Sequence, residues 1–328
     1  MLLDFLFTEP SPKPGRRWPT RASPSRLFRL PKGATHHDPT PRTVPGTAPM
    51  KFSVVIVEYA SWPLTLRCIE SLRKAGFEDF EVVVVDNGGS EPAPDLPPGT
   101  VVVESGRNLG FARAVNRGIS ASSGEFVVLI NPDSLVGEGF FEGIEAFLDA
   151  DPKVGVVGPR ILDGFDGELQ LSARREVSLV SGLLGRTSLL TRLFPDNSLV
   201  KSQFPAVTAT DAPAKVDWVS GACMAIRRDA LGSVGPLDER FFMYFEDADF
   251  CRRVRETGHA VYYLPHVEVV HEAGGSTGDR PRAIFDLHKS AFLYHRKHGK
   301  HGPFGLFSGA VLLGLAARAV AKFAASRS

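Results

Sequence analysis

Three apolar runs in the first half of the chain have the pattern of strands that are buried on both faces. They are Phe52–Val57 (FSVVIV), Glu81–Val85 (EVVVV) and Glu125–Ile130 (EFVVLI). Nearly continuous, β-branched runs of this kind are typical of a parallel sheet that helices cover on both sides. A shorter run, Val101–Glu104, has the same character. The pattern therefore predicts four strands of one central sheet.

Segments with helical spacing separate these strands. Ser61 is the expected N-cap of a first helix, and two more helices are predicted over Phe111–Ser122 and Glu138–Leu148. A strand followed by a helix and a second parallel strand forms the βαβ unit of doubly wound proteins. The fold class that this alternation predicts is α/β.

The second half of the chain returns to strand character in several places. Strands are predicted near Val154–Val157, within Val216–Ile226, and over Ala260–Leu264 and Val267–His271. Between the first two, residues 164–213 lose any clear period. The arginines of this segment are consistent with a mobile lobe near an anionic or lipid-linked partner, and they are equally consistent with an ordinary surface loop.

Residues 241–258 (FFMYFEDADFCRRVRETG) hold three acids directly after an aromatic block. A helix that begins near Glu246 and ends at Gly258 places four residues on one face: Asp247, Phe250, Cys251 and Val254. Asp249 then pairs with Arg253 in an exposed i, i+4 contact. Either the acids only satisfy the helix dipole, or Asp247 faces a pocket in which the aromatic block raises its pKa by desolvation.

Other polar residues lie at the ends of predicted strands. Asp86 and Asp133 each lie just beyond the end of one strand, and His271 ends another. The carboxyl ends of parallel strands are where doubly wound sheets bind ligands, and carboxylate oxygen suits a hard divalent cation. Taken singly, each residue has a structural alternative, because Asp often forms turns and a lone His is usually hydrogen-bonded in a core.

The composition supports one large folded domain with appendages. The chain has 328 residues, and 43% of them are hydrophobic, which is enough for a sizeable core. Residues 1–50 carry eight Lys/Arg and three Asp/Glu, so the rest of the chain carries about −4 by difference from the net charge of +1. This balance argues against a nucleic-acid partner. The three cysteines form no Cys-x-x-Cys pair, which indicates a reducing, cytoplasmic compartment.

The two ends of the chain differ from its centre. Residues 1–49 hold ten of the 25 prolines and are predicted to be a disordered leader. Residues 281–328 are basic and apolar, but the uncharged span between Lys300 and Arg318 is shorter than the ~20 residues that cross a bilayer comfortably. An interfacial helix in peripheral contact with the inner face of the plasma membrane is one alternative, and a helix packed on the domain is the other.

Seven motifs in a fixed order carry the most specific signal. No G-x-G-x-x-G follows the first strand, and no G-x-x-x-x-G-K-[ST] is present, so the common phosphate-binding loops are absent from the sequence. The motifs are FSVVIVEY, VVVVDNGGS, GRNLGFARAVNRG, NPD, WVSGACMAIRRDAL, VGPLDERFFMYFEDADFCRRV and VVHEAGGST. Over about residues 51–298, this series closely resembles the family 2 inverting glycosyltransferases, in particular bacterial rhamnosyltransferase-like members.

The resemblance implies an A-type nucleotide-diphospho-sugar transferase fold, a single Rossmann-like mixed sheet flanked by helices. The catalytic domain is expected over residues 50–280, with a nucleotide-sugar half at 50–160 and an acceptor half at 161–280. A dTDP- or UDP-sugar donor and Mg²⁺ or Mn²⁺ are implied with it. Because Asn131-Pro132-Asp133 occupies the place of the family's Asp-x-Asp motif, Asp133 is the implied metal ligand, and His271 matches a His that joins the metal in some relatives.

The resemblance also assigns roles on the two sides of the site. On the donor side it implies five residues: Asp86, Arg107, Asn108, Asn131 and Glu58. The chain departs from the family at the last of these, since Glu58-Tyr59-Ala60 stands where Thr-Tyr-Asn is usual. On the acceptor side it implies four: Trp218, Gly221, Ala222 and Glu246. Asp247 matches the catalytic base, which takes a proton from the acceptor hydroxyl in a single inverting displacement.

The implied function is transfer of rhamnose or another hexose to a glycan or lipid-linked acceptor in cell-surface polysaccharide synthesis. A sugar nucleotidyltransferase is one alternative, but it requires a Gly-rich basic loop after the first strand, and residues 58–61 contain neither glycine nor lysine. A non-catalytic glycan-binding relative is the other, and such a protein is expected to lose Asp247 or Asp133 while keeping the fold.

Overall fold

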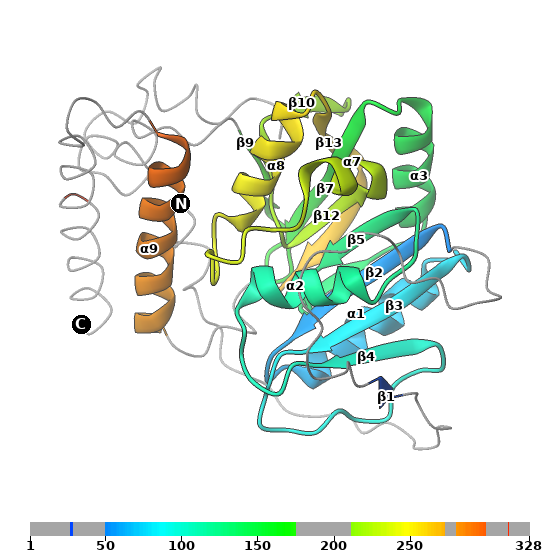
Figure 1. Ribbon diagram of the computed structural model, residues 1–328. Coiled ribbons are helices and arrows are strands. Elements are labelled where there is room, and N and C mark those ends of the chain that lie inside the picture. The colour runs from blue at the N-terminus through cyan, green and yellow to red at the C-terminus, as the bar shows by residue number, and fades with distance from the viewer. Residues whose placement is uncertain (1–26, 29–49, 175–210, 273–279, 300–313, 315–328) are drawn as a thin grey trace.

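The chain forms a central mixed sheet between two layers of helices (Figure 1). The computed structural model describes residues 27–28, 50–174, 211–272, 280–299 and 314. The strands are β1 (Leu27–Phe28), β2 (Phe52–Glu58), β3 (Phe80–Asp86), β4 (Thr100–Glu104), β5 (Phe126–Ile130), β6 (Ser134–Val136), β7 (Val154–Asp163), β8 (Leu169–Gln170), β9 (Ala173–Arg174), β10 (Ala214–Val216), β11 (Trp218–Val219), β12 (Cys223–Arg227) and β13 (Ala260–His271). The helices are α1 (Trp62–Lys74), α2 (Phe111–Ser120), α3 (Phe140–Ala150), α7 (Arg228–Val234), α8 (Glu246–Glu256) and α9 (Arg280–His298).

The order of the sheet is β1-β4-β3-β2-β5-β12-β7-β13-β10, with β6 paired to β13 and β8 to β7. Strands β4, β3, β2 and β5 are parallel. Strand β12 then runs antiparallel between β5 and β7, while β13 is parallel to β7. The predicted α/β class with a mixed sheet is therefore confirmed.

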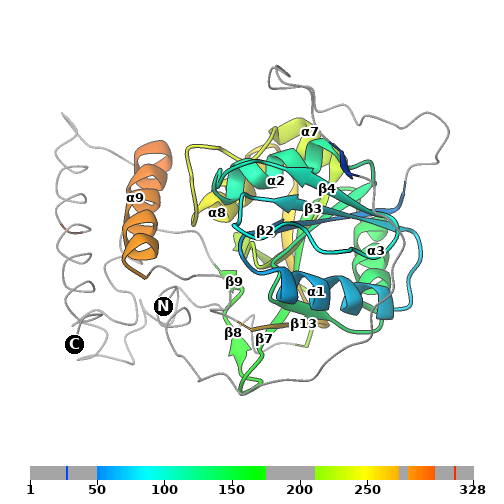
Figure 2. The same cartoon turned by 90° about the horizontal axis from the view of Figure 1, so that it is seen from below.

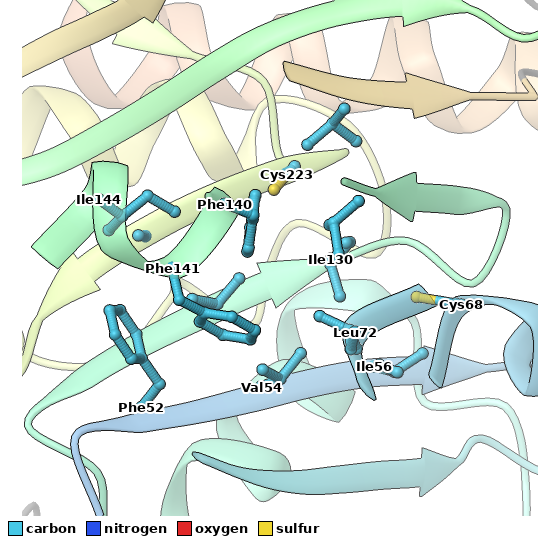
Figure 3. Packing of buried hydrophobic residues seen from close by; sticks show 14 of the residues in the cluster. Phe52, Val54, Ile56, Cys68, Leu72, Ile130, Phe140, Phe141, Ile144 and Cys223 are labelled. Atoms are coloured by element: carbon cyan, nitrogen blue, oxygen red, sulfur yellow. The ribbon is translucent and has the colours of Figure 1, made fainter. Parts of the chain in front are cut away.

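Helices cover both faces of the sheet. Helices α1 and α3 pack on one face, where Phe52 and Phe141 lie together with their ring centroids 5.1 Å apart (Figure 3). The ring centroid of Phe126 is 5.4 Å from that of Phe52. Helices α2, α7 and α8 cover the other face, where the buried side chains include Val115, Phe250 and Val254 (Figure 2). Burial on both faces explains why the strands are nearly continuous apolar runs rather than alternating ones.

The topology brings the ends of several strands to one edge of the sheet. Strands β3 and β5 are parallel, so Asp86 and the residues after Ile130 lie at the same edge. Since β12 is antiparallel, it begins at this edge, and Cys223 pairs with Ile130. Strand β13 runs in the direction of β5 and ends here at His271. This shared edge, called the polar edge below, holds the candidate site.

Several local predictions need correction. The two strands expected over residues 260–271 are one strand, β13, with an irregularity between Leu264 and Glu268. The segment expected as one strand at 216–226 contains parts of β10, β11 and β12. Helix α1 begins after Ser61 as expected, but the Ser61 hydroxyl donates to Glu58 instead of capping the helix.

The contact of Asp249 with Arg253 is present but is not the exposed pair that the sequence predicts. Asp249 is fully buried and bonds the Arg253 Nε at 2.9 Å. Its other oxygen lies 2.6 Å from Lys297 Nζ and 2.7 Å from His298 Nε2, and both residues belong to α9. Helix α9 is thereby tied to the inner face of α8, beside which it lies in Figures 1 and 2.

The ends of the chain lie mostly outside the described residues. Within the expected leader, residues 1–49, the structure describes only β1, which pairs in parallel with β4. The expected lobe over residues 164–213 is described only at its two ends, where residues 164–174 contain β8 and β9 and residues 211–213 precede β10. Residues 175–210 and, apart from Gly314, residues 300–328 lie outside the described residues, so the expected interfacial helix falls there. Across the described ranges, no helix has the length and apolar character needed to cross a membrane.

Replacing Gly118 with alanine should destabilise the fold. A Cβ at this position of α2 would collide with the Val55 side chain of the sheet and lie 3.0 Å from Val85 Cγ2. We expect Gly118→Ala to lower the free energy of unfolding by about 1–3 kcal/mol, as overpacking does. Urea unfolding followed by circular dichroism measures the change.

Gly232 is the matched control, because it also lies in a helix but has nothing within 4 Å of an added Cβ. Gly232→Ala should leave stability unchanged or raise it by about 0.5–1 kcal/mol through the better helix propensity of alanine. Equal effects of the two substitutions would contradict close contact between α2 and the sheet.

Candidate active site

Helix α8 begins in an unusual backbone conformation. Tyr244 and Phe245 both lie in the left-handed region, with φ of 70° and 68°. Consecutive residues other than glycine rarely adopt this conformation, which costs on the order of 1–3 kcal/mol each. The resulting turn directs the chain into α8 so that Glu246 and Asp247 occupy its first turn.

Backbone amides hold the Asp247 carboxylate. Its Oδ2 accepts a hydrogen bond from the Gly221 N–H at 3.0 Å, and its Oδ1 accepts from the Ala248 N–H at 2.7 Å. The side chain is half-buried. Desolvation raises the pKa of Asp247, while the two amides and the charge of Arg174 oppose this rise. A partly accessible carboxylate with a raised pKa is suited to accept a proton near neutral pH.

Arg174 is the cation that faces Asp247. Its Nε donates to the Leu171 carbonyl at 3.1 Å, and its guanidinium lies 5.1 Å from the centre of the Trp218 ring. Strand pairing fixes this arrangement, because Arg174 on β9 is directly opposite Trp218 on β11. Burial lowers the pKa of Arg174 to about 10, so the side chain remains charged at neutral pH.

Glu246 is more deeply buried than the adjacent Asp247. Its side chain is buried, and its Oε2 has no hydrogen-bond partner among the residues that the structure describes. Desolvation and then the charge of Asp247 raise the pKa of Glu246 well above its usual value. Of the two adjacent acids, Glu246 is the buried one whose pKa burial raises well above its usual value, and Asp247 is the one that keeps partial exposure.

Two loops at the polar edge hold three of the residues that the sequence predicts for the donor side. Asp86 is half-buried and its Oδ1 accepts from the Gly88 N–H at 3.0 Å. Gly88 has φ +82°, and a Cβ there would collide with the backbone of Arg107. The Asn108 Oδ1 accepts from the Asn87 Nδ2 at 3.2 Å. The structure thus brings Asp86, Arg107 and Asn108 together, and the side chains of the last two are exposed.

The loop after β4 is joined to the aromatic block that precedes α8. The Phe111 N–H at the beginning of α2 donates to the Phe242 carbonyl at 2.6 Å. Gly110 has φ +81°, and a Cβ at this residue would overlap the Phe242 side chain. A loop after β4 and the aromatic block before α8 are therefore in direct contact.

Asp133 and His271 meet at the polar edge. Asp133 Oδ1 lies 3.2 Å from His271 Nε2, and the side chains are 2% and 12% exposed. Asn131 Nδ2 is 3.4 Å from the same His271 nitrogen. The Asn131 N–H also donates to the Ala222 carbonyl at 2.9 Å, next to the Gly221 amide that holds Asp247. One short series of contacts thus connects the predicted metal ligands with the predicted base.

The structure gives two of the predicted site residues structural contacts. The Glu58 carboxylate is fully buried and accepts from the Ser61 N–H, the Ser61 hydroxyl and the Thr65 hydroxyl at 2.6–2.9 Å. A donor contact by Glu58 would have to break these bonds. Trp218 is 6% exposed and contributes to the core below α8, so its place on the acceptor side is indirect, through Arg174.

Comparison with known proteins identifies the family. The model for glycosyl transferase family 2 matches residues 53–233. The chain is 34% identical over 260 residues to an N-acetylglucosaminyl-diphospho-decaprenol L-rhamnosyltransferase of Mycobacterium tuberculosis, and the match covers 74% of this chain and 82% of the relative. The chain belongs to glycosyl transferase family 2.

Solved structures confirm the A-type fold of this family 2 glycosyltransferase. The structure of GalNAc-T7 with UDP, GalNAc and Mn²⁺ aligns with a TM-score of 0.56 at 18% identity, over 76% of this chain and 48% of that one. A mannosyltransferase of Pyrobaculum calidifontis with GDP-Man and Mn²⁺ aligns with a TM-score of 0.50 at 20% identity, over 86% and 77% of the two chains.

Sequence reasoning missed three residues of the site in this family 2 glycosyltransferase. Asn87 joins the two donor-side loops, and its place directly after Asp86 was the available signal. Arg174 was noticed only as one arginine in a segment without clear period. Gln170, which contacts His271 Nδ1 at 2.9 Å, has no motif around it that would reveal its role.

We expect Glu246→Gln to become more stable relative to the wild type as pH rises from about 5 to 8. The folded state keeps a proton on Glu246 that the unfolded state releases above the usual glutamate pKa, so this group lowers wild-type stability throughout that window. The glutamine side chain does not titrate, so Glu246→Gln lacks this contribution to the pH dependence of stability. The measurement is urea unfolding of both proteins at pH 5, 6.5 and 8.

Glu256→Gln, in the last turn of the same helix, is the control. The Glu256 side chain is 56% exposed and pairs with Arg252, so its removal should give a stability difference with no trend over this pH range. If the free energies of unfolding of the wild type and Glu246→Gln change with pH in the same way, Glu246 is already ionised in the folded protein.

Proposed function

We propose that this family 2 glycosyltransferase transfers L-rhamnose, or a related hexose, from a dTDP- or UDP-sugar to a lipid-diphosphate-linked sugar in cell-surface polysaccharide synthesis. The observation that carries this proposal is the 34% identity with the mycobacterial rhamnosyltransferase, whose name gives N-acetylglucosaminyl-diphospho-decaprenol as its acceptor. The match spans 82% of that relative. The family match favours this reading over a sugar nucleotidyltransferase.

Asp247 is the proposed general base. It is the accessible member of the adjacent acid pair, and the amides of Gly221 and Ala248 fix the direction of its oxygens. A positioned carboxylate of this kind typically contributes about 10²–10⁴-fold to the rate. Glu246, which is buried and keeps its proton, supports the turn rather than accepting the substrate proton.

Asp86, Arg107, Asn108 and Asn131 are the proposed donor contacts. The first three lie on the two loops that Asn87 and Gly88 hold together, and the exposed guanidinium of Arg107 is available to an anionic diphosphate. Asn131 connects this donor side to the Ala222 backbone. Gly221 and Ala222, with their small side chains, leave the backbone beside Asp247 open to an acceptor.

Asp133 and His271 are the proposed ligands of Mg²⁺ or Mn²⁺. Asp133 Oδ1 is buried and has no hydrogen-bond partner, although it lies 3.2 Å from an imidazole nitrogen. No cluster of three or more His, Cys, Asp or Glu suited to a metal occurs in the part of the chain that the structure describes. Two protein ligands suffice where substrate phosphates complete the coordination, as is common for Mg²⁺. When bound, the cation supplies positive charge for the leaving diphosphate.

The reaction that these residues support is a single displacement. Asp247 accepts the proton of the acceptor hydroxyl while that oxygen forms a bond to the anomeric carbon of the donor sugar. The bond between the anomeric carbon and the diphosphate oxygen breaks, and its electrons leave with the nucleoside diphosphate. Attack from the face opposite the leaving group inverts the configuration at the anomeric carbon.

A lipid-linked acceptor places the reaction at a membrane surface. We propose a cytoplasmic enzyme in peripheral contact with the inner face of the plasma membrane. The C-terminal sequence supports this reading, because Arg296 is exposed near the end of α9 and the chain continues into an apolar segment that carries Arg318 and Lys322.

The purified full-length protein should release dTDP from dTDP-L-rhamnose when Mn²⁺ and a polyprenyl-diphosphate-linked N-acetylglucosamine are both present. The expected product carries one rhamnosyl residue whose anomeric configuration is opposite to that of the donor. Mass spectrometry and NMR identify it, and UDP-glucose and UDP-galactose serve as comparison donors. EDTA should abolish transfer, and added Mn²⁺ or Mg²⁺ should restore it.

Retention of configuration would exclude the single displacement, and full turnover in EDTA would exclude the metal. Donor binding without any transfer would instead support a non-catalytic relative.

Asp247→Asn should reduce kcat by about 10²-fold or more while leaving the fold and dTDP affinity nearly unchanged, because the amide has the same shape but cannot accept the proton. Steady-state kinetics and calorimetric dTDP binding measure the two effects. Glu256→Gln, on the same helix but far from its first turn, should retain wild-type kcat. Activity of Asp247→Asn above about one tenth of the wild type is incompatible with its role as the base.

A further inference from the structure

The two ring nitrogens of His271 have different surroundings. Nδ1 lies 2.9 Å from the Gln170 Oε1. Nε2 lies 3.2 Å from the Asp133 Oδ1 and 3.4 Å from the Asn131 Nδ2. Because a neutral imidazole carries its proton on only one nitrogen, the position of that proton decides what Nε2 can bind.

Two acceptors fix the orientation of the Gln170 amide. Its Nε2 donates to the Asp163 Oδ2 at 3.1 Å and to the carbonyl oxygen of His271 at 3.0 Å. If the amide were turned over, its oxygen would face these two oxygens and lose both hydrogen bonds. The Gln170 Oε1 must therefore point at His271 Nδ1, and Gln170 is itself buried, with 8% of its surface exposed.

The oxygen of Gln170 can only accept a hydrogen bond, so His271 Nδ1 must carry a proton. This holds for the neutral ring and for the charged ring alike. In the neutral ring, Nε2 carries a lone pair. It has the Asn131 Nδ2 donor at the long distance of 3.4 Å, and it faces the Asp133 Oδ1, a buried oxygen without a hydrogen-bond partner among the described residues. Two electron-rich atoms at this separation, with no proton between them, form a pair that a divalent cation would stabilise.

Strand pairing explains how these residues are brought together. Gln170 on β8 is opposite Ile161 of β7, and Asp163 at the end of β7 is opposite His271 at the end of β13. The backbone of β7 thus sets the distance between Gln170 and the imidazole. Asp163 also accepts from the Phe165 N–H at 2.9 Å, which holds the turn between β7 and β8.

We propose that Gln170 is a positioning residue of the cation site, which keeps the His271 proton on Nδ1 and thereby presents Nε2 to a divalent cation beside Asp133. A partner that sets the tautomer and orientation of a metal-binding histidine commonly changes metal affinity by 10–100-fold when it is replaced. This inference rests on the proposed cation site, so its test measures cation binding and the tautomer apart from sugar transfer.

The first measurement is the affinity of the full-length protein for Mn²⁺ in the presence of dTDP, by electron paramagnetic resonance. Gln170→Leu removes the acceptor and should weaken Mn²⁺ binding by about 10-fold or more. Leu169→Ala alters the same short strand outside this hydrogen-bond network and should leave Mn²⁺ affinity unchanged.

The second measurement is the ¹⁵N NMR spectrum of histidine-labelled protein without metal, with His271→Gln used to assign the signal. The wild type should show the Nδ1-protonated form, and Mg²⁺ should shift the Nε2 signal rather than the Nδ1 signal. The wild-type spectrum needs no substitution at Gln170, so it shows which nitrogen of His271 carries the proton even if Gln170→Leu does not fold.

A wild-type ring protonated only on Nε2 would overturn the proposal, as would wild-type Mn²⁺ affinity in a folded Gln170→Leu protein. Failure of the wild type to bind Mn²⁺ at all would overturn the cation site and this inference with it. Failure of sugar transfer alongside normal Mn²⁺ binding would count against the proposed substrates and leave the role of Gln170 standing.

Discussion

The reversal of one strand determines where the site can form. Strand β12 runs antiparallel between β5 and β7, so the residues that precede it return to the edge at which the parallel strands end. Two hydrogen bonds depend on this return: the Asn131 N–H donates to the Ala222 carbonyl, and the Gly221 N–H donates to Asp247. In an entirely parallel sheet, the segment before β12 would lie at the opposite edge, far from Asp86 and Asp133. The mixed character of the sheet is thus a requirement of the site and not only a feature of the fold.

The parts of the fold and site that follow from local pattern were predictable from the sequence. The valine-rich runs identified β2, β3 and β5, because burial on both faces leaves a signal in every residue of a strand. Asp86 and His271 were recognisable for a related reason, since polar residues at strand ends stand out against apolar runs. The helical period at residues 246–256 placed Asp247 at the start of α8, where the structure also has it.

Residues whose partners are distant in sequence were not predictable. Asp249 has the local spacing of an exposed ion pair with Arg253, yet its burial depends on Lys297 and His298, almost fifty residues later. Gln170 and Arg174 gain their roles from strand pairing that joins β8 to β7 and β9 to β11. A single sequence holds no record of these pairings. Glu58 is a different case, because its hydrogen-bond partners Ser61 and Thr65 are close in sequence, but only the structure shows that its carboxylate is turned toward them.

The burial of Asp249 has a consequence for motion. Its carboxylate is closed to solvent and receives donors from both α8 and α9. If α9 moved away, Asp249 would lose two of these donors, and the Met243 carbonyl would lose its bond from the Ser290 hydroxyl in the aromatic block before α8. These shared contacts lead us to expect that the two helices open together, as a single cooperative unit. Any event that restrains α9 would then also narrow the range of positions open to Asp247, so the placement of the proposed base would be set in part by a helix that follows it in the chain.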